Sequence, residues 1–224
     1  MLKPRKRLTK KQIKEDKLVT TYFRVMDFID QNQKMVMIGA AAVIIAAALI
    51  VLFMRSKRNA ELKSALELTK ARVEIQQNNL ETASDILKSL VDNYSGTENA
   101  GRGVFYLGNI HYSKGEYDAA MNYYNEYLDD YKGNDILTSS AYSGLAASHE
   151  QKSEYLEAAR IYEKGANKFP KHFEAPKQLM DAARCYRLAN NKNKARELYQ
   201  RIIDEYPDSS YKRDAETYAS MLQS

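Results

Sequence analysis

The chain has 224 residues, of which 28% are charged and 44% are apolar, enough for one or two folded domains. The formal net charge is +5, but residues 1–58 hold 13 Lys/Arg against 4 Asp/Glu, a net of +9. Residues 59–224 hold 21 Lys/Arg against 25 Asp/Glu, a net charge of −4. The basic character therefore belongs to the N-terminal part of the chain. This distribution argues against a basic nucleic-acid-binding domain, and we expect no nucleic-acid partner.

Residues 1–17 form a basic tail, with eight Lys/Arg in seventeen positions. Clusters of this kind bind nucleic acid or anionic lipid in other proteins, but here a hydrophobic segment follows the cluster. Basic flanks of hydrophobic segments commonly set membrane orientation. We therefore expect a cytoplasmic tail that contacts anionic lipid.

Residues 18–34 are predicted to form an amphipathic interfacial helix, because apolar and charged side chains fall on opposite faces at helical spacing. The helix could equally pack on a membrane helix of a partner, and the sequence leaves both interpretations open. The apolar face comprises Val19, Tyr22, Phe23, Met26 and Ile29, and the opposite face comprises Arg24, Asp27 and Asp30.

Residues 35–54, MVMIGAAAVIIAAALIVLFM, carry no charge. At a rise of about 1.5 Å per residue, a helix of this length spans roughly 30 Å, the thickness of the hydrocarbon core of a bilayer, so the segment predicts a transmembrane helix. A cleaved signal peptide with Ala46-Ala47-Ala48 as its processing site is the alternative, but the apolar run exceeds the usual ~7–15 residues. The small residues around Gly39 either pack on another membrane helix or simply make a weakly hydrophobic span.

Two counts of the flanking charges disagree about orientation. Residues 1–34 carry ten Lys/Arg, which favours a cytoplasmic N-terminus, whereas within twenty residues of the span three Lys/Arg precede it and six follow it. The tail is short enough to count in full, and charge in a long folded domain affects translocation little. We therefore expect a single-pass inner-membrane protein of a Gram-negative cell, with the rest of the chain in the periplasm.

Residues 55–63 contain no proline or glycine. We expect them to form a helical connector that continues the membrane helix into the next segment with at most a slight bend. Such a stiff join would hold that segment close to the bilayer.

From residue 64 onward the sequence repeats with a period of 37 or 38 residues. Ala120 and Tyr124, for example, recur 38 residues later as Ala158 and Tyr162. The aromatic residues that close the copies keep the same steps, at Tyr94, Tyr131, Phe169 and Tyr206. Four copies fit, repeat 1 at 64–97, repeat 2 at 101–134, repeat 3 at 139–172 and repeat 4 at 176–209, followed by a capping helix over 210–224.

Each copy is predicted to form two antiparallel helices. In the second copy, apolar side chains follow helical spacing on both sides of Gly115, which separates the two helices. Pro170 and Pro207 end the second helices of later copies, since proline lacks the amide proton. Small residues are predicted to let paired helices approach, at Gly108, Ala146 and Ala183 on first helices and at Ala83, Ala120, Ala158 and Ala195 on second helices.

This pattern resembles the tetratricopeptide repeat family, whose marks stand at Leu107, Gly108, Gly115, Tyr117, Ala120, Tyr124, Pro170 and Pro207. The first copy departs from it, with Glu67, Lys70 and Asn78 where the family has apolar residues or glycine. The resemblance, together with the apolar segment, implies an all-α fold. We expect a single N-terminal transmembrane helix, then an α-solenoid of about four repeats and a C-terminal capping helix.

Stacked helix pairs leave a concave surface lined by the first helix of each copy, and such arrays hold peptides or partner domains there. Aligning the copies gives a predicted groove, with aromatic and Met side chains toward its middle and cations toward the last copy. The predicted groove residues are Arg72, Ile75, Phe105, Asn109, Tyr112, Glu150, Lys177, Met180, Arg184 and Arg187.

Some members of the family grip a C-terminal carboxylate with a lysine, two asparagines and further cations. Asn109 and Lys177 match that arrangement. However, Phe105, Gly144 and Asp181 stand where a lysine, an asparagine and an arginine would be needed, so we do not expect a carboxylate clamp.

No residue pattern predicts catalysis, a metal or a cofactor, and we do not expect an enzyme. Cys185 is the single cysteine, which we expect to pack as a small apolar residue, with an intermolecular disulfide left open. His111 and His149 share one repeat position, and no Cys, Asp or third His stands at ligand spacing from them.

The layout of basic tail, amphipathic segment, one span and four repeats is similar to the membrane-anchored tetratricopeptide ancillary subunit of the bacterial Sec translocon. That resemblance implies a membrane-anchored protein-binding scaffold whose partners are the Sec translocon, a membrane-tethered periplasmic chaperone and exported polypeptides. Two alternatives stay open. One is a structural coordinator of cell-envelope assembly or division, and the other is a cytosol-facing organelle import receptor, which needs the opposite orientation.

Overall fold

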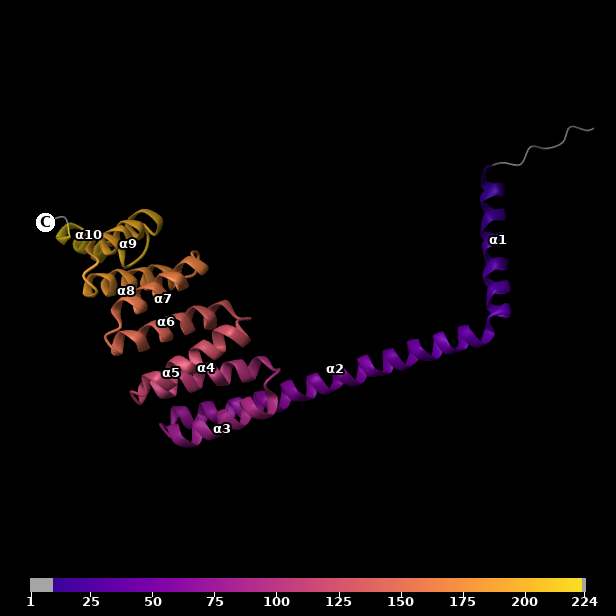
Figure 1. Cartoon of the computed structure of the whole chain (residues 1–224), viewed down its shortest axis with the longest axis horizontal. Helices are drawn as coiled ribbons and strands as arrows, with labels where there is room; N and C mark the ends of the chain where they lie inside the picture. Colours follow the sequence, from indigo (N-terminus) through magenta and orange to yellow (C-terminus); the bar gives the residue numbers. More distant parts are fainter. Residues whose placement is uncertain (1–9, 223–224) are drawn as a thin grey trace, which may run out of the picture. The chain divides into compact units, whose positions relative to one another are not determined.

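The computed structural model describes residues 10–222, which form helices joined by short turns (Figure 1). The chain divides into two units, Met1–Ser56 and Lys57–Ser224. The first nine positions of the predicted basic tail, and the last two of the predicted capping segment, lie outside the described residues.

The first unit contains α1 (Lys10–Gln31) and the beginning of α2 (Gln33–Gln76). The uncharged segment 35–54 lies within α2, and its large side chains are exposed, with Ile38 and Phe53 each 71% accessible. Among the described residues, α2 is the one helix long and apolar enough to cross a membrane. On α1 the apolar side chains Tyr22 and Phe23 are also exposed.

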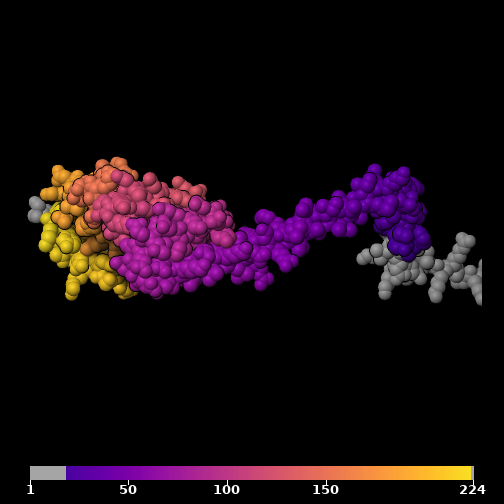
Figure 2. Space-filling model, turned by 90° about the horizontal axis from the view of Figure 1, so that it is seen from below, coloured from indigo at the N-terminus to yellow at the C-terminus, as the bar shows by residue number. Residues whose placement is uncertain are grey.

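The second unit consists of helix pairs that follow one another in chain order, and Figure 2 shows them as one continuous surface from purple to yellow. This confirms the expected all-α arrangement of stacked helix pairs. The last part of α2 packs on α3 (Leu80–Tyr94), since Leu68 and Ala71 share a core cluster with Ala83 and Leu87. The later pairs are α4 (Glu98–Ser113) with α5 (Tyr117–Glu126) and its π-helical extension η1 (Tyr127–Tyr131), α6 (Asp135–Gln151) with α7 (Tyr155–Lys168), and α8 (Ala175–Leu188) with α9 (Lys192–Glu205). The last helix is α10 (Lys212–Met221).

The turn inside each pair holds one residue in the left-handed conformation. The next residue donates its backbone N–H back to the carbonyl five positions earlier, as Asn79 does to Glu74 at 2.9 Å. This is the Schellman arrangement that ends helices, and it explains the positive φ. Asn78 occupies the turn position that is Gly115 in the second pair, and it fits there because Asn tolerates the left-handed conformation. The four residues are Asn78 (φ 63°), Gly115 (76°), Ser153 (62°) and Asn190 (60°).

The other helix ends are fixed by capping side chains and prolines. The Thr97 and Asn134 side chains accept from backbone N–H groups in the first turns of α4 and α6. The second helices α7 and α9 end at Lys168 and Glu205, two residues before Pro170 and Pro207, as the sequence predicts.

The helices of the stack approach closely where small residues face large ones. The Tyr124 ring is 2% exposed and lies against Gly108 of α4 and Gly144 of α6, where an added Cβ would come within 3 Å of the ring. The hydroxyl of Tyr124 donates to Asn109 Oδ1 at 2.7 Å. The predicted alanines of the second helices are all fully buried, at Ala83, Ala120, Ala158 and Ala195.

The helix α10 covers the last pair. Ala215 and Ala219 are buried, and the rings of Tyr218 and Tyr199 stack at 5.5 Å between centroids. This placement fits the predicted capping role, because a solenoid end needs a helix with one polar face.

Replacing Gly115 with Ala should lower the free energy of unfolding by about 1 kcal/mol, because the left-handed conformation is unfavourable for Ala. The added Cβ would contact no neighbour, so no steric effect contributes. Gly96→Ala is the matched control, since that position also has open space but no positive φ. Thermal or urea unfolding measures both. Equal effects of the two substitutions would contradict the backbone explanation.

Replacing Gly144 with Ala should lower the free energy of unfolding by about 1–3 kcal/mol, because the new methyl group displaces the buried Tyr124 ring. In a Tyr124→Leu background the same substitution should cost much less, so a double-mutant cycle should show coupling. Additive effects would show that Tyr124 and Gly144 do not share the contact described here.

Candidate partner-binding surface

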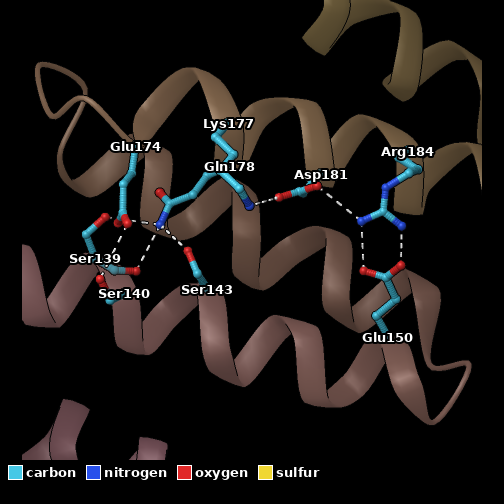
Figure 3. Close-up of polar contacts among 9 residues, drawn as sticks. All are labelled: Ser139, Ser140, Ser143, Glu150, Glu174, Lys177, Gln178, Asp181 and Arg184. Carbon is cyan, nitrogen blue, oxygen red and sulfur yellow. Dashed lines mark hydrogen bonds and ion pairs between the residues drawn. The ribbon is translucent and has the colours of Figure 1, made fainter. Parts of the chain in front are cut away.

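The predicted groove residues lie on four helices, and polar contacts connect those of α6 and α8. Glu150 of α6 and Arg184 of α8 form a two-point ion pair, one arm of which measures 2.9 Å (Figure 3). Arg184 also bonds Asp181 at 3.1 Å, and Asp181 in turn accepts from Lys177 at 2.8 Å. The hydrogen bonds that Arg184 donates to Glu150 raise the pKa of its guanidinium above the ordinary value.

This network changes what the cations of the last repeat can do. Both Lys177 and Arg184 are satisfied within the chain, so neither presents an uncompensated positive charge to a partner. Arg184 holds α8 in register on α6, because a paired arginine with fixed geometry orients both helices, whereas the Lys177–Asp181 pair lies within α8.

A second polar cluster lies deeper between the same helices. Gln178 is 1% exposed and its amide nitrogen donates to the Ser139 carbonyl, the Ser139 hydroxyl and the Ser143 hydroxyl at 2.9–3.1 Å (Figure 3). Buried polar groups persist when they are bonded, so these contacts fix the spacing of α6 and α8. The Gln178 amide nitrogen thus joins α8 to two serines of α6.

On α4 the structure corrects one predicted groove residue. Phe105 is 9% exposed and packs with the rings of Tyr124 and Tyr127, so it belongs to the core and not to an open surface. Asn109 is exposed but already accepts from Tyr124. Tyr112 is half-buried and lies edge-on to Tyr117.

On α2 the two predicted groove residues differ in exposure. Arg72 is exposed, and Ile75 is half-buried against the core of the first two helix pairs. Among the described contacts, none joins either residue to the α6 and α8 network. The ten residues remain a predicted groove, and polar contacts link those of α6 and α8.

Three of them do meet around a hollow of about 170 Å³ between α8, α9 and α10. Met180, Arg184 and Arg187 line one side. The other walls are aromatic and acidic, from Tyr199, Tyr211, Asp214 and Tyr218. Burial raises the pKa of the Tyr199 hydroxyl, against the opposing effect of Arg187.

The chemistry of this hollow suits a side chain of a partner protein. Ligand pockets for cofactors commonly measure about 300–1,000 Å³, so this hollow is small for one. Its tyrosine and Met180 walls can cover an apolar or aromatic side chain, while Arg187 and Asp214 at the edge can bond the partner's backbone. We call these seven residues the cap hollow.

Sequence reasoning missed part of the cap hollow. Tyr211 and Tyr218 lie in the predicted capping segment 210–224 and Tyr199 lies in repeat 4, and none of the three is among the predicted groove residues. The first-helix alignment could not find them, because α10 has no counterpart in the earlier copies. Tyr211 and Tyr218, two aromatic residues within the predicted capping segment, are the sequence signal for this end of the stack.

The remaining reactive side chains have local partners. His111 and His149 each bond the carboxylate five positions on, Glu116 and Glu154, at 2.5 and 2.6 Å. Each of these contacts joins the end of a first helix to the turn that follows it. Among the described residues, no group of three or more His, Cys, Asp or Glu side chains is arranged to hold a metal.

Comparison with known families agrees with the repeat pattern. Residues 68–135 and 179–209 each match a model described as tetratricopeptide repeat. No curated protein matched the sequence.

Solved structures share the fold at low identity. A tetratricopeptide repeat protein from Parabacteroides merdae ATCC 43184 is 18% identical with a TM-score of 0.58, over 71% of this chain and 60% of that one. The apo form of RapI is 14% identical with a TM-score of 0.62, over 72% of this chain and 48% of that one. The chain therefore spans less than two thirds of the length of both structures. A MamA RS-1 ArsTM double mutant is 15% identical with a TM-score of 0.53, over 72% of this chain and 94% of that one.

Cys185 should resist thiol reagents in the folded protein. It is fully buried, and burial raises the pKa of its thiol to about 12, so little reactive thiolate forms near neutral pH. Labelling with a chromogenic disulfide should be slow in buffer and should accelerate in denaturant in step with unfolding. Rapid labelling of folded protein would show that α8 opens locally.

Proposed function

We propose that this chain, whose repeats are of the tetratricopeptide type, is a membrane-anchored scaffold that binds partner proteins. The fold of stacked helix pairs serves protein–protein interaction. The anchor is proposed from one observation: residues 35–54 are uncharged and their large apolar side chains are exposed. Exposed apolar surface of this extent is costly in water and is favoured in lipid.

Partner capture is proposed at the cap hollow. The rings of Tyr199 on α9 and Tyr218 on α10 stack at 5.5 Å and Ala215 of α10 is buried, so the walls of the hollow are in place before a partner arrives. A preformed site loses less conformational entropy on binding. A scaffold tethered to a membrane also raises the local concentration of its ligand near a second site on that membrane.

The more specific proposal is an ancillary subunit of the Sec translocon. Its support is the layout of a basic tail, an amphipathic segment, one apolar span and four repeats. In this proposal the repeats face the periplasm, where they recruit a membrane-tethered chaperone or hold emerging exported chains. The basic tail stays in the cytoplasm and contacts anionic lipid.

Protease added to spheroplasts should degrade residues 57–224 and leave a membrane-embedded N-terminal fragment. A variant lacking residues 35–54 should leave the membrane fraction, which tests the anchor separately from the orientation. Complete protection in intact spheroplasts, with degradation after lysis, would contradict the orientation. Full-length protein that is soluble without detergent would contradict the anchor.

The Sec assignment needs its own readout. A photo-crosslinker at Ile45 should form adducts with the Sec channel, whereas the same group at Asn193 on α9 should not. A crosslinked product set without any Sec subunit would contradict this assignment while leaving the scaffold proposal intact.

A further inference from the structure

The first helix of the stack carries an apolar stripe that faces away from the other helices. Leu62, Leu66 and Val73 of α2 are 63%, 57% and 43% exposed. They are spaced at i, i+4 and i+11, with Thr69 at i+7, so they lie along one helix face. An exposed stripe of this regularity exceeds the scattered apolar residues of an ordinary surface.

The opposite face of the same helix is already used. Leu68 and Ala71 are buried in the core formed with α3 and α4. At the other end of the stack, α10 covers the last pair. Among the described residues of this unit, none covers the stripe, so this end of the solenoid lacks the helix that the C-terminal end has.

The charges on α2 are sorted between these two faces. On the packed side Glu61 accepts from Asn99 of α4 at 3.1 Å, and Glu74 accepts from Asn79 in the turn after α2 at 2.9 Å. Cations border the stripe on both sides, with Lys63 and Lys70 on one border and Arg58 and Arg72 on the other. Lys70 also bonds Glu67, and the other three cations have no ion pair among the described contacts.

We propose that this stripe is the docking site for an amphipathic helix of a partner protein, with an apolar seam bordered by Asp or Glu. Its apolar side chains would cover Leu62, Leu66 and Val73, and its carboxylates would face the bordering cations. A second copy of this chain fits less well, because two such stripes would bring like charges together. This surface is separate from the cap hollow and does not depend on the membrane anchor.

The test uses the full chain in neutral detergent and a fluorescent designed helical peptide with a leucine seam and glutamate borders. Leu66→Ser, and separately Lys63→Glu with Arg72→Glu, should weaken binding about tenfold or more, because each removes seam burial or charge attraction. Leu156→Ser and Arg196→Glu are the matched controls at exposed positions on α7 and α9, and should bind like the unsubstituted chain.

A partner peptide with lysine borders completes the test. It should bind the unsubstituted chain weakly and the Lys63→Glu, Arg72→Glu chain more strongly. Equal binding of both peptides, or no response to the charge reversal, would overturn the proposal. Two other results would also overturn it. In the first, the chain binds no peptide but self-associates, and Leu66→Ser abolishes the self-association. In the second, a fluorophore at position 66 becomes buried when anionic vesicles are added but stays exposed when the peptide is added.

Discussion

The structure depends on large aromatic side chains seated against residues that have almost no side chain. Tyr124 fills the space between Gly108 and Gly144, and so joins three helices with one ring. Tyr131 lies on Gly101 and Tyr142 on Gly165 in the same way. Because cores are close-packed, each such site tolerates little added volume, and the stack has one register.

This packing places Tyr124, Tyr131 and Tyr142 against glycines, where they hold the helices together. The polar groups that do lie between helices, Gln178 with its serines and Arg184 with Glu150, bond within the chain and fix spacing. Among the described residues, two surfaces are the candidates for partner binding. One is the cap hollow, with tyrosine walls and Arg187, and the other is the cation-bordered stripe on α2.

Much of the fold could be predicted from the sequence because the repeat period fixes turns as well as helices. The 37 and 38 residue steps place Asn78, Gly115, Ser153 and Asn190 at equivalent turns, and all four adopt positive φ. The π-helical end of the second pair at Tyr127–Tyr131 was not expected, since no residue in it departs from helical spacing.

The surface was harder to predict, because contacts across helices are not periodic. The pairing of Arg184 with Glu150 removes a cation from the predicted groove, and no spacing rule within α8 reveals it. Phe105 follows the first-helix alignment but turns into the core, where three aromatic rings contact it. The cap hollow depends on α10, which has no equivalent in the repeats.

The central claim is that a rigid helical stack presents partner-binding surfaces, and detergent-solubilised affinity purification of the full chain tests it most directly. The comparison is with a chain carrying Arg187→Glu and Tyr218→Ala in the cap hollow. The account predicts a defined set of co-eluting proteins that the substituted chain loses while its helical content is unchanged. A chain that elutes alone, or a partner set that both versions retain, would contradict the assignment of binding to this surface.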